Sequence, residues 1–218
     1  TEVEYNNRFQ QVSFEVRYKP NQIKDPYSEL TCVVTQNSRQ DNEVIVKRPM
    51  MVGVDHVTYD HNRDLIFPAG NEFRRFETVN AHNINMGVQS IRYYDPMYHA
   101  VLMADEPRAE LQYLYDQTQF GRFTIRNAEA YGENALEADY MITHFTLDTN
   151  GKLNGGNVWL YGEFNEGYPA SQAMMKYDAA SGCYTADLLL KQGAYNYLYL
   201  WVPDGTSVGQ TSRIEGDH

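Results

Sequence analysis

Histidine and carboxylate side chains give this chain its potential for metal binding. Of the six histidines, His56 and His61 are the one pair close enough in sequence to suggest a shared ligand set. The stretch 60–64 (DHNRD) begins like a calcium loop, with oxygen-bearing side chains at alternate positions. Leu65 and Asn71 stand where that motif needs glycine and glutamate, so we interpret the stretch as a polar turn. The sequence therefore predicts no metal site and no cofactor.

Motifs for catalysis do not occur in the sequence. There is no Gly-x-Ser-x-Gly, no phosphate loop and no dinucleotide fingerprint, and no serine or cysteine lies in a recognisable nucleophile context. Carboxylates are numerous, but a single sequence does not single out a glycosidase pair. Because no set of residues takes the roles that a reaction site requires, we predict a protein without enzymatic activity.

Aromatic residues are the remaining candidates, and many lie in the run 194–202 (AYNYLYLWV). Read as a strand, this run has tyrosines and Trp201 on one face and leucines on the other, so neither face is polar. An antiparallel strand normally shows one face to water. We therefore predict that Leu198, Leu200 and Val202 form a protein interface, covered by a neighbouring domain, another chain or a missing segment. Trp159 and Trp201 are assigned to a domain core, and the tyrosines to core packing, with an interface as the alternative.

The elements that must position these residues are strands. Alternation of apolar and polar residues recurs along the chain, for example in 12–16 and 140–147, and turn-forming residues such as Asn150-Gly151 separate the runs. We predict an all-β fold of tandem β-sandwiches of the immunoglobulin-like or E-set kind. The polar stretch 126–134 sets the boundary between domains 1–132 and 136–218.

Composition restricts the partners. Eighteen Lys and Arg against 29 Asp and Glu give a net charge of −11, which would repel nucleic acid and anionic lipid. No run approaches the roughly 18 consecutive apolar residues of a membrane span, so we expect no membrane-spanning segment. The start also lacks the pattern of a signal peptide. Because the chain begins without Met and stops without a tail, we expect a processed or excised segment whose targeting signal lies elsewhere.

The last eighty residues resemble the glycogen-binding β-sandwich module of branching enzymes and of the AMP-activated kinase β subunit. The blocks that carry the resemblance are 158–165 (VWLYGEFN), 182–184 (GCY), 188–190 (LLL), 193–199 (GAYNYLY) and 203–205 (PDG). A tryptophan follows the Gly-x-Phe-Asn turn in that family, whereas Glu-Gly-Tyr follows it here. The resemblance implies, as an alternative function, a carbohydrate-binding module for a glucan-like polysaccharide, with Tyr168 and Trp159 stacking on the sugar.

Nearly the whole chain resembles the plug protein of the Bacteroidetes type nine secretion system. The blocks that carry it are 66–74 (IFPAGNEFR), 137–140 (EADY), 144–147 (HFTL), 190–193 (LKQG) and 214–218 (IEGDH). This resemblance implies a non-enzymatic chain of β-sandwich domains that plugs the periplasmic side of an outer-membrane channel protein. It also implies periplasmic, outer-membrane-associated localisation, a signal peptide in the full-length protein, and a closing strand missing from 136–218. We take this as the leading hypothesis.

Overall fold

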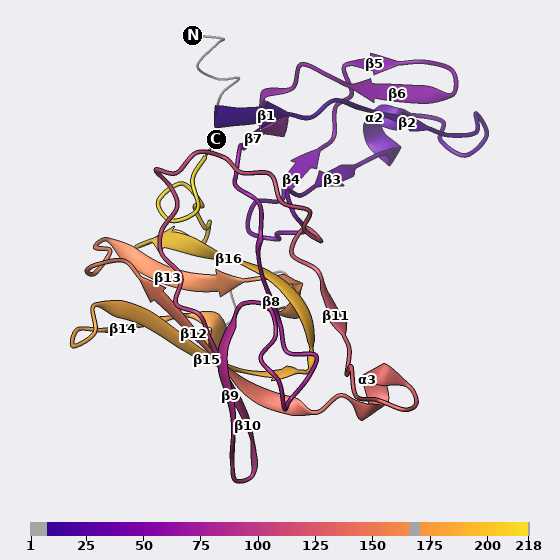
Figure 1. The fold of residues 1–218 in the computed structure, drawn as a ribbon. Helices are drawn as coiled ribbons and strands as arrows, with labels where there is room; N and C mark the ends of the chain where they lie inside the picture. The colour runs from indigo at the N-terminus through magenta and orange to yellow at the C-terminus, as the bar shows by residue number, and fades with distance from the viewer. Residues whose placement is uncertain (1–7, 166–170, 218) are drawn as a thin grey trace. The chain divides into compact units, whose positions relative to one another are not determined.

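A computed structural model describes residues 8–165 and 171–217 of the chain, and strands make up most of their regular structure (Figure 1). This confirms the predicted all-β fold. The chain divides into two compact units. The described residues of the first are 8–70 and Asp217, and those of the second are 71–216 apart from 166–170.

Short antiparallel strand pairs build the first unit. They are β1 (Phe9–Gln11) with β7 (Ile66–Pro68), β2 (Phe14–Arg17) with β6 (His56–Tyr59), β6 with β5 (Met51–Val52), and β3 (Cys32–Val34) with β4 (Val44–Val46). Two single turns complete the unit, α2 (Pro26–Glu29) and η1 (Arg63–Leu65). α2 forms because the Asp25 side chain accepts a hydrogen bond from the Tyr27 N–H while Pro26 presets the first turn.

The core of the first unit collects the inward-facing residues of these strands. Its fully buried members are Val46, Val57, Tyr59, Leu65 and Phe67. The ring of Phe14 stacks on that of Tyr59 with centroids 4.8 Å apart. Cys32 packs against this core, and its thiol is free and half-buried, as is that of Cys183 in the second unit.

Two facing sheets form the second unit, and Figure 1 shows β13 and β16 lying across β12 and β15. One sheet has the order β14 (Lys176–Asp178), β15 (Cys183–Lys191), β12 (Tyr140–Asp148), β10 (Met97–Leu102), β9 (Val88–Tyr94). The other has the order β11 (Phe123–Ile125), β16 (Gly193–Pro203), β13 (Gly156–Tyr161), with β8 (Arg74–Glu77) also pairing with β16. Short helical turns lie outside the sheets, at α3 (Asn134–Glu137), η2 (Glu163–Asn165) and η3 (Ser171–Ala173).

The main core lies between these sheets, with Phe76 of β8 near its centre. The Phe76 ring stacks on Tyr195 at 5.0 Å between centroids and meets Phe145 of β12 edge-on at 5.4 Å. Such pairs contribute about 0.5–1.5 kcal/mol each beyond the burial of their area. The tyrosine face of β16 is therefore core, which is the first of the two roles that the sequence suggested for it.

The predicted domain boundary at 133–135 does not coincide with the division of the chain. It falls inside the second unit, whereas the division lies between Gly70 and Asn71. The reason is long-range pairing: β8 and β11 both pair with β16, and β10 pairs in parallel with β12. The polar stretch 126–134 is a connection between the sheets of one sandwich.

Within the described ranges, no helix is both long enough and apolar enough to cross a membrane.

Candidate interaction surface

Alternation along the strands gives the five-stranded sheet a buried face and an outer face. In β12 the side chains of Met141, Phe145 and Leu147 are buried, while Ile142 and His144 between them are half-exposed. Strand pairing carries this pattern to the neighbours. We call the outward set the outer sheet face: Ser90, Arg92 and Tyr94 of β9, His99 and Val101 of β10, Ile142 and His144 of β12, and Asp187 and Leu189 of β15.

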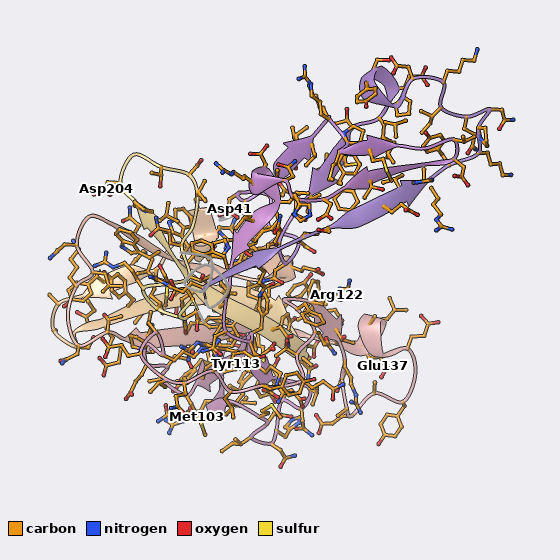
Figure 2. All side chains as sticks on the ribbon, turned by 90° about the horizontal axis from the view of Figure 1, so that it is seen from above. Asp41, Met103, Tyr113, Arg122, Glu137 and Asp204 are labelled. Atoms are coloured by element: carbon orange, nitrogen blue, oxygen red, sulfur yellow. The ribbon has the colours of Figure 1, made fainter. Side chains whose placement is uncertain are left out.

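Large apolar side chains remain exposed on and beside the outer sheet face. Tyr94 is 53% exposed and Leu189 is 56% exposed. Met103, labelled in Figure 2, follows β10 on the same alternation and is 59% exposed. Exposed apolar groups that gather on one face, with polar groups among them, are the pattern of a protein contact surface.

A cavity of about 140 Å³ opens on the outer sheet face. It is lined by Ser90, Arg92, Tyr94, His99, Val101 and His144. The residues come from three neighbouring strands, because Arg92 of β9 pairs with His99 of β10, and Val101 of β10 pairs with His144 of β12. The lining thus combines one guanidinium, two imidazoles and two hydroxyls with apolar groups.

Three side chains form a hydrogen-bonded relay across the strands that border this cavity. Nδ1 of His99 lies 2.9 Å from Nε2 of His144, and Nδ1 of His144 lies 2.6 Å from Oδ1 of Asp187. The planes of the two imidazoles are within 18° of parallel, with ring centroids 5.1 Å apart, and the Tyr94 ring meets His99 edge-on at 5.2 Å. The relay holds both histidines in fixed orientations at the cavity.

A second polar cluster is buried in the same unit. Glu215, whose side chain is 1% exposed, accepts hydrogen bonds from Nε of Arg74 at 3.1 Å and Nε of Arg108 at 2.6 Å. Arg74 also donates to Asp105 at 2.7 Å. The hydroxyls of Tyr197 and Tyr199 donate to the other oxygen of Asp105, each at 2.7 Å. We call these six residues the buried ionic cluster.

Burial and neighbouring charges shift the pKa values of three residues in the buried ionic cluster. Burial lowers the pKa of the Arg74 guanidinium, but the carboxylates of Glu215 and Asp105 outweigh that effect and raise it above its ordinary value. Burial, with the Asp105 carboxylate, raises the pKa values of Tyr197 and Tyr199 well above their usual range. At neutral pH the Arg74 guanidinium is therefore charged and both phenols keep their protons, and the cluster is a structural element.

The predicted interface at Leu198, Leu200 and Val202 is wrong for its first two residues. Leu198 is 3% exposed and Leu200 is fully buried, and both pack with Phe73 and Tyr161 of the same unit. Val202, near the end of β16, remains half-exposed. The second apolar face of β16 has its cover within the chain, because the segment before β8 and the following loop around Gly209 lie against it.

Trp159 does not stand out as a sugar platform. It is half-buried and packs on the cluster of Leu198 and Leu200, in line with its assignment to a core. In the turn after β13, Phe164 packs edge-on against Tyr195, and the Asn165 amide donates to the Leu160 carbonyl at 2.7 Å. The turn is thus part of the sandwich. Tyr168 lies outside the described residues, so the glucan-binding alternative stays a prediction.

The calcium-like stretch forms the polar turn that the sequence indicated. The Asn62 side chain accepts from the Asp64 N–H and caps η1, and Asp60 accepts from the Ser13 hydroxyl. These bonds, from the Ser13 hydroxyl first and then the His61 N–H, lower the pKa of Asp60. Over the two described ranges, no three His, Cys, Asp or Glu side chains come together in a set that could hold a metal ion.

The second unit is, in class, an all-β sandwich that presents one outer sheet face with a small polar cavity. A solved structure of similar sequence and fold is that of a hypothetical protein from Parabacteroides merdae, with 42% identity and a TM-score of 0.92. The similarity covers 100% of this chain and 54% of that one, so the chain spans about half of its length. The sequence matches no protein-family model and no curated protein.

Proposed function

We propose that this chain is a non-enzymatic component of a bacterial protein secretion system that binds the periplasmic side of an outer-membrane channel protein and plugs it. The sequence blocks that resemble the type nine plug protein, such as 66–74, support the proposal. Residence in the periplasm at the outer membrane, and an export signal in the full-length protein, belong to the same proposal.

The observation that carries the proposal is the outer sheet face. Leu189, Met103 and Tyr94 are each more than half exposed on or beside this face, and apolar groups left in water on one face favour a docking surface. A docked protein would remove these groups from water, and this burial would stabilise the complex by about 25 cal/mol for each Å² of apolar area. The channel protein is the partner to which we assign this face, because the plug role requires a sustained contact with it.

Recovery of the channel with the tagged full-length protein tests this proposal in the source bacterium. A Met103→Ser/Leu189→Ser variant should recover about tenfold less of the channel protein, because loss of two exposed anchors costs about 1.4 kcal/mol or more. Quantitative mass spectrometry of detergent-solubilised outer membranes measures the yield. The matched control is Met50→Ser/Leu114→Ser, which changes an exposed methionine and an exposed leucine outside the strands of the five-stranded sheet.

Two results would contradict the proposal in different ways. Equal channel recovery from both double variants would remove the outer sheet face as the docking surface. Absence of any channel protein from the wild-type preparation would remove the plug function itself.

A further inference from the structure

Arg92 places a guanidinium at the cavity on the outer sheet face, where its side chain is exposed. In the described part of the chain the Arg92 guanidinium makes no hydrogen bond or ion pair, whereas Arg74 and Arg108 are both paired with Glu215. The chain has eleven more acidic than basic residues, so carboxylates are not scarce. A guanidinium beside two imidazoles and two hydroxyls offers several hydrogen-bond donors to an anionic group.

Hydrogen-bond chemistry determines where protons lie in the relay. A carboxylate only accepts, so Nδ1 of His144 donates to Asp187, and Nε2 of His144 then accepts from Nδ1 of His99. In the neutral relay, Nε2 of His99 is therefore the unprotonated end. A proton taken up there makes His99 a cation while both hydrogen bonds persist, and the Asp187 carboxylate at the far end offsets the added charge.

The charges around the cavity indicate the charge of its ligand. Arg92 faces it from β9, His99 from β10 and His144 from β12, with Asp187 of β15 behind His144, while Tyr94 is a neutral phenol. Arg92 and Asp187 cancel when the relay is neutral, and one proton on His99 leaves a net charge of +1. A ligand with one negative charge would balance the net charge of +1. A dianion such as phosphate would leave an excess of negative charge in a chain that already carries −11.

The size of the cavity indicates the source of that charge. At about 140 Å³ the cavity is smaller than the roughly 300–1,000 Å³ of sites that enclose whole small molecules. It has room for a carboxyl group on a short aliphatic stem, with Val101 and Tyr94 against the stem. A guanidinium fork suits a carboxylate because it can donate two parallel hydrogen bonds.

We propose that this cavity binds the carboxylate of an acidic side chain on the protein that docks on the outer sheet face, and that His99 takes up a proton on binding. The docked protein is the partner assigned under the proposed function, and the inference rests on that assignment for the source of the carboxylate. The binding chemistry itself belongs to the isolated chain.

Acetate, as a side-chain mimic, tests the site on the purified full-length protein. Histidine side-chain signals are followed by NMR during titrations with acetate and, separately, with inorganic phosphate, at pH 6 and pH 8. Acetate should shift the His99 and His144 signals saturably, and it should bind more tightly at pH 6 because a proton on His99 adds positive charge to the site. Arg92→Gln should weaken acetate binding at least tenfold. Arg126→Gln, which removes the same charge from an exposed arginine outside the cavity, should not.

A third variant distinguishes the contribution of the His99 proton to acetate binding from that of the Arg92 guanidinium. His99→Gln keeps a side chain that can hydrogen-bond to His144 but cannot gain a proton, so acetate binding should persist weakly and differ less between pH 6 and pH 8 than in the wild type. No saturable shift in the wild type, an equal loss in both arginine variants, or tighter binding of phosphate than of acetate would each overturn the site. If acetate binds as expected but Arg92→Gln recovers as much channel protein as Arg126→Gln, the assignment to a partner's side chain is overturned while the plug function stands.

Discussion

Two polar clusters of the second unit each place arginine near a carboxylate, but they complete their hydrogen bonds to different extents. In the buried ionic cluster, Glu215, Asp105 and the two arginines direct their groups at one another, and the tyrosine hydroxyls fill the remaining acceptor positions. The relay on the outer sheet face instead stops at His99, beside an unpaired Arg92. The comparison teaches that completion of the hydrogen bonding, more than residue type, separates a cluster that stabilises the fold from one that is available for binding.

Removing one charge from the buried ionic cluster should cause the largest loss of stability. Glu215→Gln leaves Arg74 and Arg108 buried with one carboxylate fewer, and we expect it to lower the free energy of unfolding by about 3–5 kcal/mol. Urea unfolding followed by tryptophan fluorescence measures this, because both tryptophans of the chain lie in the second unit.

The matched change on the surface is Asp187→Asn, which removes a carboxylate from the exposed end of the relay. We expect a change within about 0.5 kcal/mol, as for most surface substitutions. Equal destabilisation by Glu215→Gln and Asp187→Asn would erase the distinction between the clusters.

Two leucines allow the same comparison between a buried position and an exposed position for apolar side chains. Leu200→Ala removes a side chain that is fully buried on the second face of β16, and should cost about 2–5 kcal/mol. Leu189→Ala, on the outer sheet face, should change stability by no more than about 0.5 kcal/mol. Thermal and urea unfolding of both variants measure the difference, and a small effect at Leu200 would revive the prediction of an uncovered stripe.

Alkaline pH should weaken the second unit through its buried phenols. Tyr197 and Tyr199 have raised pKa values, so the folded state keeps protons that the unfolded chain loses near pH 10. Their contribution to stability is complete below pH 10, and above it the free energy of unfolding falls by up to about 1.4 kcal/mol per pH unit for each tyrosine.

Urea unfolding at pH 9, 10 and 11 measures this slope. Tyr199→Phe should make it shallower by about 1.4 kcal/mol per pH unit, whereas Tyr131→Phe, at an exposed position, should leave it unchanged. An unchanged slope in Tyr199→Phe would mean that this phenol does not keep its proton in the folded state.

Local pattern was sufficient to predict most strands and their inward faces. Alternation in 140–147 correctly separates the buried Met141 and Phe145 from the half-exposed His144, because a strand repeats every two residues whatever its partner. The tyrosine ladder of β16 was likewise assigned to the core, where Tyr195, Tyr197 and Tyr199 are buried.

Pairing between distant strands was beyond the reach of the sequence. His99 and His144 are 45 residues apart, and no pattern along a single strand indicates that β10 and β12 align in parallel. A pattern of histidines along one strand therefore does not reveal the relay, whose histidines lie on two strands. The same limit misplaced the domain boundary, since the pairing of β8 with β16 decides it. For the same reason, the sequence did not indicate that Phe73 and Tyr161 cover Leu198 and Leu200.

The bonds of Glu215 also bring the beginning and the end of the second unit together. The Asn71 amide donates to the Glu215 carbonyl at 3.2 Å, and Arg74 holds its side chain, so residues 71–216 start and stop at one spot. The two ends of this segment are close enough in space to be joined. A peptide link between them, with new termini at the Asn150-Gly151 turn, would preserve every strand pair of the second unit. We therefore expect residues 71–216 to tolerate circular permutation and insertion into a surface loop of another protein.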